Sequence, residues 1–159
     1  MIANGIFMSH IIYIIQVWGG CSNYLLDSLQ VLQNRAAREV TKLDRYTPIK
    51  ILLKQCNWLS VRQMIVYYDL LLVFKIRQDK KPVYLYNKFS QKYAYPTRFS
   101  NNNEIRQVQL PKSEIKKSAF VNRSTVSWNN LPNDLTNLKN YKMFKIQLRR
   151  WVKENIAIS

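Results

Sequence analysis

The chain has 159 residues, and a hydrophobic content of 47% excludes wholesale disorder and allows one domain with a real core. Lys and Arg number 25 against 9 for Asp and Glu, which gives a formal charge of +16 at pH 7. A charge this large favours encounter with polyanions, so nucleic acid and anionic membranes are the candidate partners. The alternative is that the basic residues only solvate the surface.

Scarce residue types exclude several kinds of site. Cys21, Cys56 and His10 are the only cysteines and the only histidine, and their spacing does not match a metal site. A total of three glycines argues against a phosphate-binding loop, and no candidate nucleophile has an evident base beside it. We therefore expect no catalytic residue, no metal and no cofactor. Free thiols suit a reducing compartment, which predicts an intracellular protein of the nucleus or cytoplasm.

The first candidate element is an apolar run from Ile6 to Trp18. The polar residues Ser9, His10 and Gln16 interrupt it, and it is too short to cross a bilayer comfortably. It also lacks the basic start of a signal peptide, although cleavage near Gly19-Gly20 stays an alternative. We expect a buried helix or strand here, and an anchor lying on a membrane surface is the other alternative.

The second element is an amphipathic helix over about 23–43, capped by Ser22 or Asn23. Apolar residues at spacings of three and four form one side: Leu25, Leu29, Leu32, Ala36, Val40 and Leu43. Basic residues fall roughly opposite: Arg35, Arg38, Lys42 and Arg45. The pattern predicts that one side packs on the core while the other presents positive charge.

A short helix over about 48–56 is expected next, with Thr47-Pro48 as its start and with Ile51 and Leu52 turned inward. A longer helix then begins at Ser60, where Gln63 completes a capping box. It is apolar nearly all round, which is typical of the central helix of a bundle. Six residues on facing stripes should be buried together: Leu29, Leu32, Val61, Ile65, Tyr68 and Leu72.

The middle of the chain is polar and basic. After a short helix over about 83–88, residues 90–118 are predicted to form an extended linker, with a short strand pair near 104–110. Tyrosines alternate with basic residues in this part of the chain: Tyr84, Tyr86, Tyr93 and Tyr95. Exposed aromatic side chains among basic residues can stack on single-stranded bases, or they can equally cover the core beneath a loop.

The C-terminal part predicts two helices joined by a motif. A helix over about 114–128 leads into Trp128-Asn129-Asn130-Leu131-Pro132, whose tryptophan and leucine should anchor it by packing. A last helix over about 140–156 repeats the amphipathic design. Its apolar side is formed by Phe144, Leu148, Trp151 and Val152. Its basic side is formed by Lys142, Lys145, Arg149, Arg150 and Lys153.

Four segments together resemble one protein family. They are Val17-Trp18-Gly19, Leu32-Gln33-Asn34-Arg35-Ala36-Ala37-Arg38, the stretch from Pro48 through Trp58-Leu59-Ser60-Val61, and the Trp128–Pro132 motif followed by the Phe144-Lys145 helix. Their order is similar to the C-terminal part of the reverse transcriptases of non-LTR (LINE, jockey-like) retrotransposons, over roughly residues 9–155. The resemblance implies a thumb and a C-terminal extension, with the catalytic part upstream of Met1. Only Tyr67-Tyr68-Asp69 is faintly similar to the metal-binding motif of that catalytic part, and it lacks the second aspartate.

These observations predict a mainly α fold, with a thumb-like helical bundle at residues 1–88, a basic linker at 89–113 and a helical extension at 114–159. The predicted function is non-catalytic, sequence-nonspecific binding of the RNA or DNA backbone. The expected contacts are Arg35, Arg38, Lys42, Arg45, Lys142, Lys145, Arg149, Arg150 and Lys153. The missing polymerase portion is a further candidate partner, and neither a small-molecule substrate nor a membrane is expected. The alternative is a structural remnant or interaction module with no ligand of its own.

Overall fold

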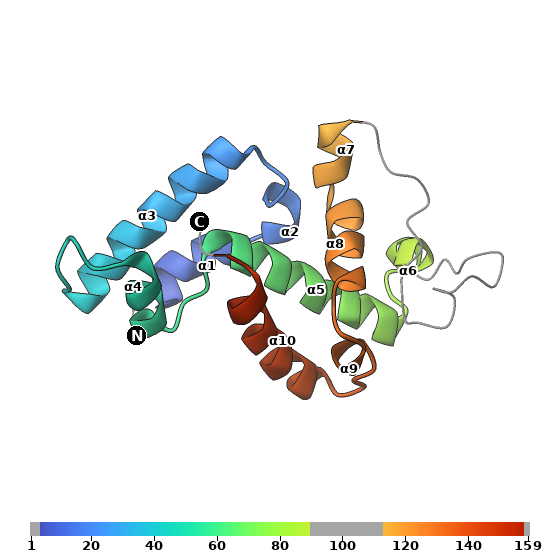
Figure 1. Cartoon of the computed structure of the whole chain (residues 1–159). Helices are drawn as coiled ribbons and strands as arrows, with labels where there is room; N and C mark the ends of the chain where they lie inside the picture. Colours follow the sequence, from blue (N-terminus) through green and yellow to red (C-terminus); the bar gives the residue numbers. More distant parts are fainter. Residues whose placement is uncertain (1–3, 90–112, 158–159) are drawn as a thin grey trace.

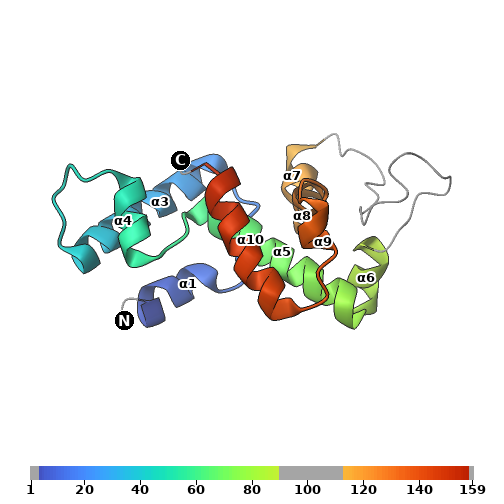
Figure 2. The same cartoon turned by 60° about the horizontal axis from the view of Figure 1, so that its bottom comes forward.

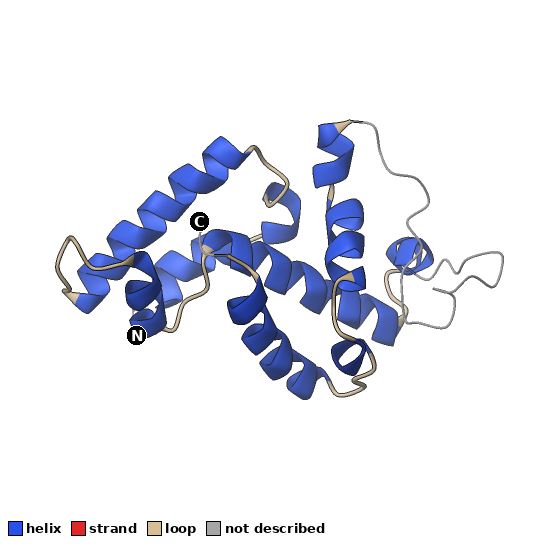
Figure 3. Cartoon of the chain, viewed as in Figure 1, coloured by secondary structure: helices blue, strands red, loops and turns tan. Residues whose placement is uncertain are grey.

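A computed structural model of the chain describes residues 4–89 and 113–157, and every regular element in these two ranges is helical (Figure 3). The predicted mainly α fold class is therefore confirmed. In chain order the elements are a π-helical turn η1 (Asn4–Met8), α1 (Ser9–Ile12), α2 (Ile15–Trp18), α3 (Asn23–Thr41), α4 (Ile49–Cys56), α5 (Val61–Asp79), α6 (Val83–Phe89), α7 (Glu114–Ser118), α8 (Phe120–Asn129), α9 (Asn133–Thr136) and α10 (Tyr141–Asn155).

Helix α5 is the central element, as its sequence predicts. It begins with the expected capping box, in which Ser60 Oγ accepts from the Gln63 amide and Gln63 Oε1 accepts from the Ser60 amide at 3.0 Å. Buried side chains occur on most of its surface because α2, α3, α6, α8 and α10 all contact it. Figure 1 shows α5 crossing the middle of the molecule, with α3 and α4 toward one end and α6 at the other.

The C-terminal helices pack on α5 through aromatic side chains. Helix α10 runs back along α5: Phe144 stacks on Phe74 with ring centroids 4.2 Å apart, and Gln63 donates to the Ile156 carbonyl at 2.8 Å. Figure 2 shows α10 lying across α5. Trp128 and Leu131 are buried, and the Trp128 ring lies 6.0 Å from that of Phe144. The packing role predicted for the Trp-Asn-Asn-Leu-Pro motif is confirmed, and one core includes residues from both ends of the chain.

Several predicted boundaries differ from the structure. The single helix expected over 114–128 is divided into α7 and α8 by a break at Ala119, whose backbone is extended. The first apolar run forms short helical pieces, and it buries Met8, Ile11 and Ile15 while leaving other apolar side chains exposed. No helix within the described ranges has both the length and the apolar character needed to cross a membrane. The strand pair near 104–110, Tyr93 and Tyr95 lie outside the described residues.

The predicted orientation of α3 is wrong. Three residues of its expected core side are about half exposed, Leu25 at 54%, Leu32 at 51% and Val40 at 48%. The other three are only partly buried: Leu29, Ala36 and Leu43. The helix instead buries a neighbouring face that is mostly polar: Leu26, Gln30, Gln33, Asn34 and Ala37. Of the six residues expected to be buried together, Val61 and Ile65 are fully buried and Leu32 is not.

Hydrogen bonds to the chain around the start of α5 explain this rotation. The first amides of a helix have no partner within the helix, and Gln30 Oε1 accepts from the Val61 amide at 2.8 Å. Gln33 donates to the Leu59 carbonyl at 2.8 Å and accepts from Gln30 at 2.9 Å. Gln30 also donates to Asn34 at 2.9 Å. A leucine in these positions would leave buried backbone groups unpaired, so the polar face of α3 packs inward.

A similar correction applies to the short helix α4. Ile51, which was expected to turn inward, is 52% exposed, whereas Leu52 and Leu53 are buried. Pro48 stands at the N-cap position just before the helix, and Asn57 ends it in the left-handed conformation with φ of 54°. This ending turns the chain toward Trp58 and the start of α5. It also places Asn57 beside α10, where the candidate interface lies.

Candidate nucleic-acid interface

Helix α10 presents the basic side that its sequence predicts. Asn140 caps the helix by accepting from the Lys142 and Met143 amides at 2.9 Å and 3.3 Å. The apolar side lies inside the protein, where Phe144, Leu148 and Val152 are fully buried and Trp151 is half-buried. Four cations of the basic side are exposed and one, Arg149, is half-buried: Lys142, Lys145, Arg149, Arg150 and Lys153. Glu154 is the only carboxylate of this helix.

Two of these cations converge on the loop that joins α4 to α5. Arg149 Nη2 donates to the Asn57 carbonyl at 2.6 Å, and Lys153 Nζ donates to the Asn57 side-chain oxygen at 3.0 Å. Partial burial, together with the positive charge of Arg149, lowers the pKa of Lys153. Neither cation pairs with a carboxylate in the described part of the chain. Two positive charges therefore share one neutral partner, Asn57, so an anion that binds near them would be attracted by both.

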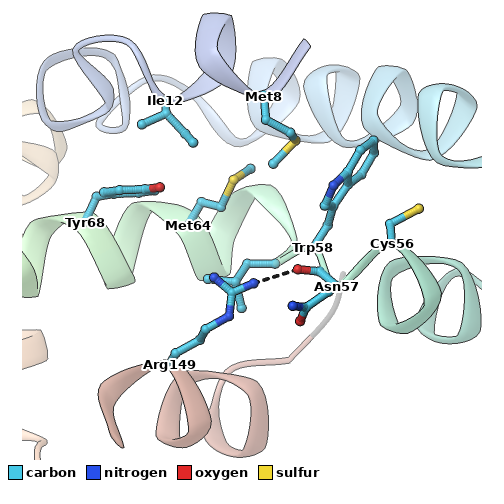
Figure 4. A pocket seen from close by; sticks show the side chains of 9 residues that line it. Met8, Ile12, Cys56, Asn57, Trp58, Met64, Tyr68 and Arg149 are labelled. Atoms are coloured by element: carbon cyan, nitrogen blue, oxygen red, sulfur yellow. Dashed lines mark hydrogen bonds between the residues drawn. The ribbon is translucent and has the colours of Figure 1, made fainter. Parts of the chain in front are cut away.

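A pocket of about 290 Å³ is lined by Arg149 and by Asn57, the residue that both cations bind. Its walls come from η1, α1, the end of α4, the α4–α5 loop, α5 and α10. Figure 4 shows Tyr68 and Trp58 toward opposite ends, Ile12 on one side and Arg149 across from it. Burial raises the pKa of the Tyr68 hydroxyl, and the nearby positive charge of Arg149 opposes that shift, so this hydroxyl keeps its proton. The sequence does not predict the pocket, because its walls are far apart in the chain.

The basic group of α3 is less concentrated than its pattern predicts. Arg35 is exposed, but Lys42 lies beyond the last helical residue and pairs with Glu39 at 3.1 Å. Arg45 is exposed in the following turn, and Arg38 is half-buried, with its Nε lacking a hydrogen-bond partner. The four cations of residues 23–45 are accompanied by three carboxylates. This segment therefore carries much less net charge than α10.

The most strongly perturbed carboxyl group belongs to a structural ion pair that sequence reasoning missed. Asp69 is 1% exposed, and Arg123 binds both of its oxygens, at 2.7 Å and 3.2 Å. Burial raises the pKa of Asp69 to about 6, against the opposing hydrogen bond and charge of Arg123. The available signal was an aspartate in the middle of the apolar run of α5, since a buried carboxyl group requires a partner. The Tyr67-Tyr68-Asp69 segment thus lies in a packed helix.

Arg123 also explains Gly20, the second of the two glycines that end the first apolar run. It donates to the Ser118 carbonyl at 2.8 Å and to the Gln16 carbonyl at 2.7 Å, so it joins α2, α5 and the α7–α8 junction. A Cβ atom at Gly20 would lie 2.5 Å from the Ser118 carbonyl oxygen and 2.9 Å from Arg123. The glycine is required by this close approach. Arg123 is therefore a packing residue, although it stands beside the basic linker in sequence.

Neither a metal site nor a comparison with known proteins assigns a function to the chain. Across residues 4–89 and 113–157, no cluster of three or more His, Cys, Asp or Glu residues is placed to hold a metal ion. Cys21 and Cys56 are both free thiols. No protein-family model, no curated protein and no solved structure matches the chain.

Proposed function

We propose that the chain binds RNA or DNA through the phosphate backbone, without reading sequence, and that the basic side of α10 is the main contact surface. The observation that supports it most is five cations against one carboxylate on a helix that buries Phe144, Leu148 and Val152 in the core. Side chains three and four residues apart are about 5–6 Å from each other, a spacing comparable to that of phosphates along one strand. Several cations can therefore meet several phosphates at once, and such contacts position a strand without specifying its bases.

The resemblance to non-LTR reverse transcriptases supports the same proposal, because it implies a thumb and a C-terminal extension of a nucleic-acid polymerase. Its motifs coincide with packing features: Gln33 binds the Leu59 carbonyl, and Trp128 and Leu131 are in the core. In this proposal the chain is a non-catalytic thumb-and-extension fragment that grips nucleic acid for a polymerase part. Arg35 and Arg45 are exposed and would add weaker contacts than α10, because carboxylates of the same segment offset their charge.

One observation favours a second function, that of a protein-interaction module. The exposed stripe on α3 includes Leu25, Leu32 and Val40, which lie about two turns apart on one side of the helix, with the partly buried Leu29 and Ala36 between them. A row of apolar side chains that is exposed or only partly buried is a candidate protein–protein contact surface. This second function predicts binding to a protein and no affinity for nucleic acid at low salt. The two functions are therefore separated by one binding measurement.

Fluorescence anisotropy tests the proposal by measuring the affinity for a labelled oligonucleotide of about 16 nucleotides, either single-stranded or duplex. The variant Lys142→Gln/Lys145→Gln/Arg150→Gln removes three exposed cations of α10. The control Lys50→Gln/Lys88→Gln/Lys116→Gln removes three exposed cations on other helices, so that both variants have the same net charge.

We expect the α10 variant to lose at least about 10-fold in affinity at low salt, and the control to lose about 3-fold or less. Equal losses would show that binding depends on total charge and not on α10. If the wild-type chain does not bind at low salt, the proposal is wrong and the interaction module takes its place.

A further inference from the structure

The pocket beside Arg149 has the composition of a site for a flat, apolar ring that carries an anion. Tyr68 and Trp58 supply aromatic rings, and Met8 and Met64 supply polarizable thioether groups. These four side chains reach the pocket from three separate parts of the chain, as Figure 4 shows. The cavity of about 290 Å³ is near the lower end of the sizes usual for small-molecule sites. A single ring system suits it better than a larger ligand.

The polar groups of the pocket lie at one edge. Arg149 lines the pocket and is held in place by its hydrogen bond to the Asn57 carbonyl at 2.6 Å. Burial raises the pKa of the Tyr67 hydroxyl, and the charge and hydrogen bonding of Arg149 oppose that rise. Lys153 follows one helical turn later and binds the Asn57 side chain. An anion attached to a ring in the pocket would meet Arg149, and Lys153 would lie one helical turn away on the other side of Asn57. The basic side of α10 continues from the same edge toward Lys142 and Lys145.

We propose that this pocket receives one unpaired nucleobase, while the neighbouring phosphates lie on the basic side of α10. The inference rests on the proposed function and adds a preference for single-stranded over duplex nucleic acid. A base has a flat face that stacks on aromatic side chains whatever its identity, so the site is tolerant of sequence. A base in a duplex is paired and stacked, and it must be extruded at a cost of a few kcal/mol before it can enter such a pocket.

The first test fills the pocket without changing charge. Ile12 is half-buried and points into the pocket, so Ile12→Phe should occupy part of the space for the base. Ile6→Phe is the matched control, because Ile6 is exposed and is not part of the pocket. We expect Ile12→Phe to weaken single-strand binding about 10-fold and to leave duplex binding within about 2-fold. Circular dichroism establishes that both variants are folded.

A second test uses the wild-type chain and needs no substitution. A single-stranded oligonucleotide that contains 4-thiothymidine is bound, irradiated and digested, and the crosslinked peptides are identified by mass spectrometry. We expect crosslinks at Trp58, Met64 or Tyr68 with the single strand, and none there with the duplex of the same sequence.

The outcomes separate this inference from the proposed function. Binding of both nucleic acids with crosslinks only on α10, or equal losses for the Ile12 and Ile6 variants, would overturn the base pocket and leave backbone binding intact. Absence of binding by either strand at low salt would overturn both. A pocket-filling variant that affects single strand and duplex equally would also contradict the inference, because the effect would then not depend on an unpaired base.

Discussion

Replacing Gln33 by leucine should destabilise the protein more than truncating the neighbouring Leu32 to alanine, although the amphipathic pattern predicts the reverse. Gln33 is fully buried, and Gln33→Leu would leave the Leu59 carbonyl and one amide hydrogen of Gln30 unpaired. Each buried unsatisfied group costs about 1–3 kcal/mol, so we expect a loss of roughly 2–4 kcal/mol after the gain from leucine burial. Leu32 is 51% exposed and leaves no cavity, so Leu32→Ala should cost about 1 kcal/mol or less.

Urea unfolding followed by circular dichroism measures both free energies of unfolding, provided that the dependence on denaturant is unchanged. Val31→Ala is the matched control, because Val31 is exposed on the same helix and should change stability by no more than Leu32→Ala does. A loss of roughly 2–5 kcal/mol for Leu32→Ala, together with a neutral Gln33→Leu, would refute the polar docking of α3. Such a result would restore the orientation that the leucine pattern predicts.

Three further predictions concern the ion pair and the cap of α5. Arg123→Met should lower the free energy of unfolding by about 3–5 kcal/mol, because it leaves the Asp69 carboxylate buried without its partner, and adding Asp69→Leu should restore much of that loss. Because burial raises the pKa of Asp69 from 3.8 to about 6, the folded state holds this proton more tightly than the unfolded chain. The contribution of Asp69 to stability should therefore decline as pH rises from about 4 to about 6. The urea midpoint of the wild-type chain should fall across that interval by more than the midpoint of Asp69→Asn does. Ser60→Ala should cost about 0.5–2 kcal/mol in the same assay, whereas Ser22→Ala, at an N-cap whose side chain makes no capping hydrogen bond, should cost less.

The sequence predicts the helices best where local signals agree. The capping box at Ser60 and an almost wholly apolar surface identify α5, and a basic side opposite an apolar side identifies α10. The ends of α3 are predicted to within two residues, but its rotation is not. The pattern ranks leucine above glutamine for burial. In the fold, the amide at Val61 and the carbonyl at Leu59 need partners, and glutamine side chains supply them.

The candidate site also has a part that the sequence predicts and a part that it does not. The five cations of α10 follow from helical spacing, since the helix has one clearly apolar side. The pocket beside Arg149 depends on tertiary contacts that bring α1, the α4–α5 loop and α10 together, and no local pattern encodes them. The Asp69–Arg123 pair lies between these cases. An isolated aspartate in α5 signals a buried partner, but 54 residues separate the two, so spacing alone does not identify Arg123.

The salt dependence of binding tests the central claim most directly. Each phosphate neutralised by the protein contributes about 0.7–0.9 to the slope of log affinity against log salt concentration. Measured from about 50 to 200 mM salt, the wild-type slope should therefore be steep, and Lys142→Gln/Lys145→Gln/Arg150→Gln should flatten it by about 2–3 units. The charge-matched control on α4, α6 and α7 should change the slope by less than one unit. A folded α10 variant that binds with the wild-type slope would contradict the account, because the basic side of α10 would then not be the surface that meets the phosphates.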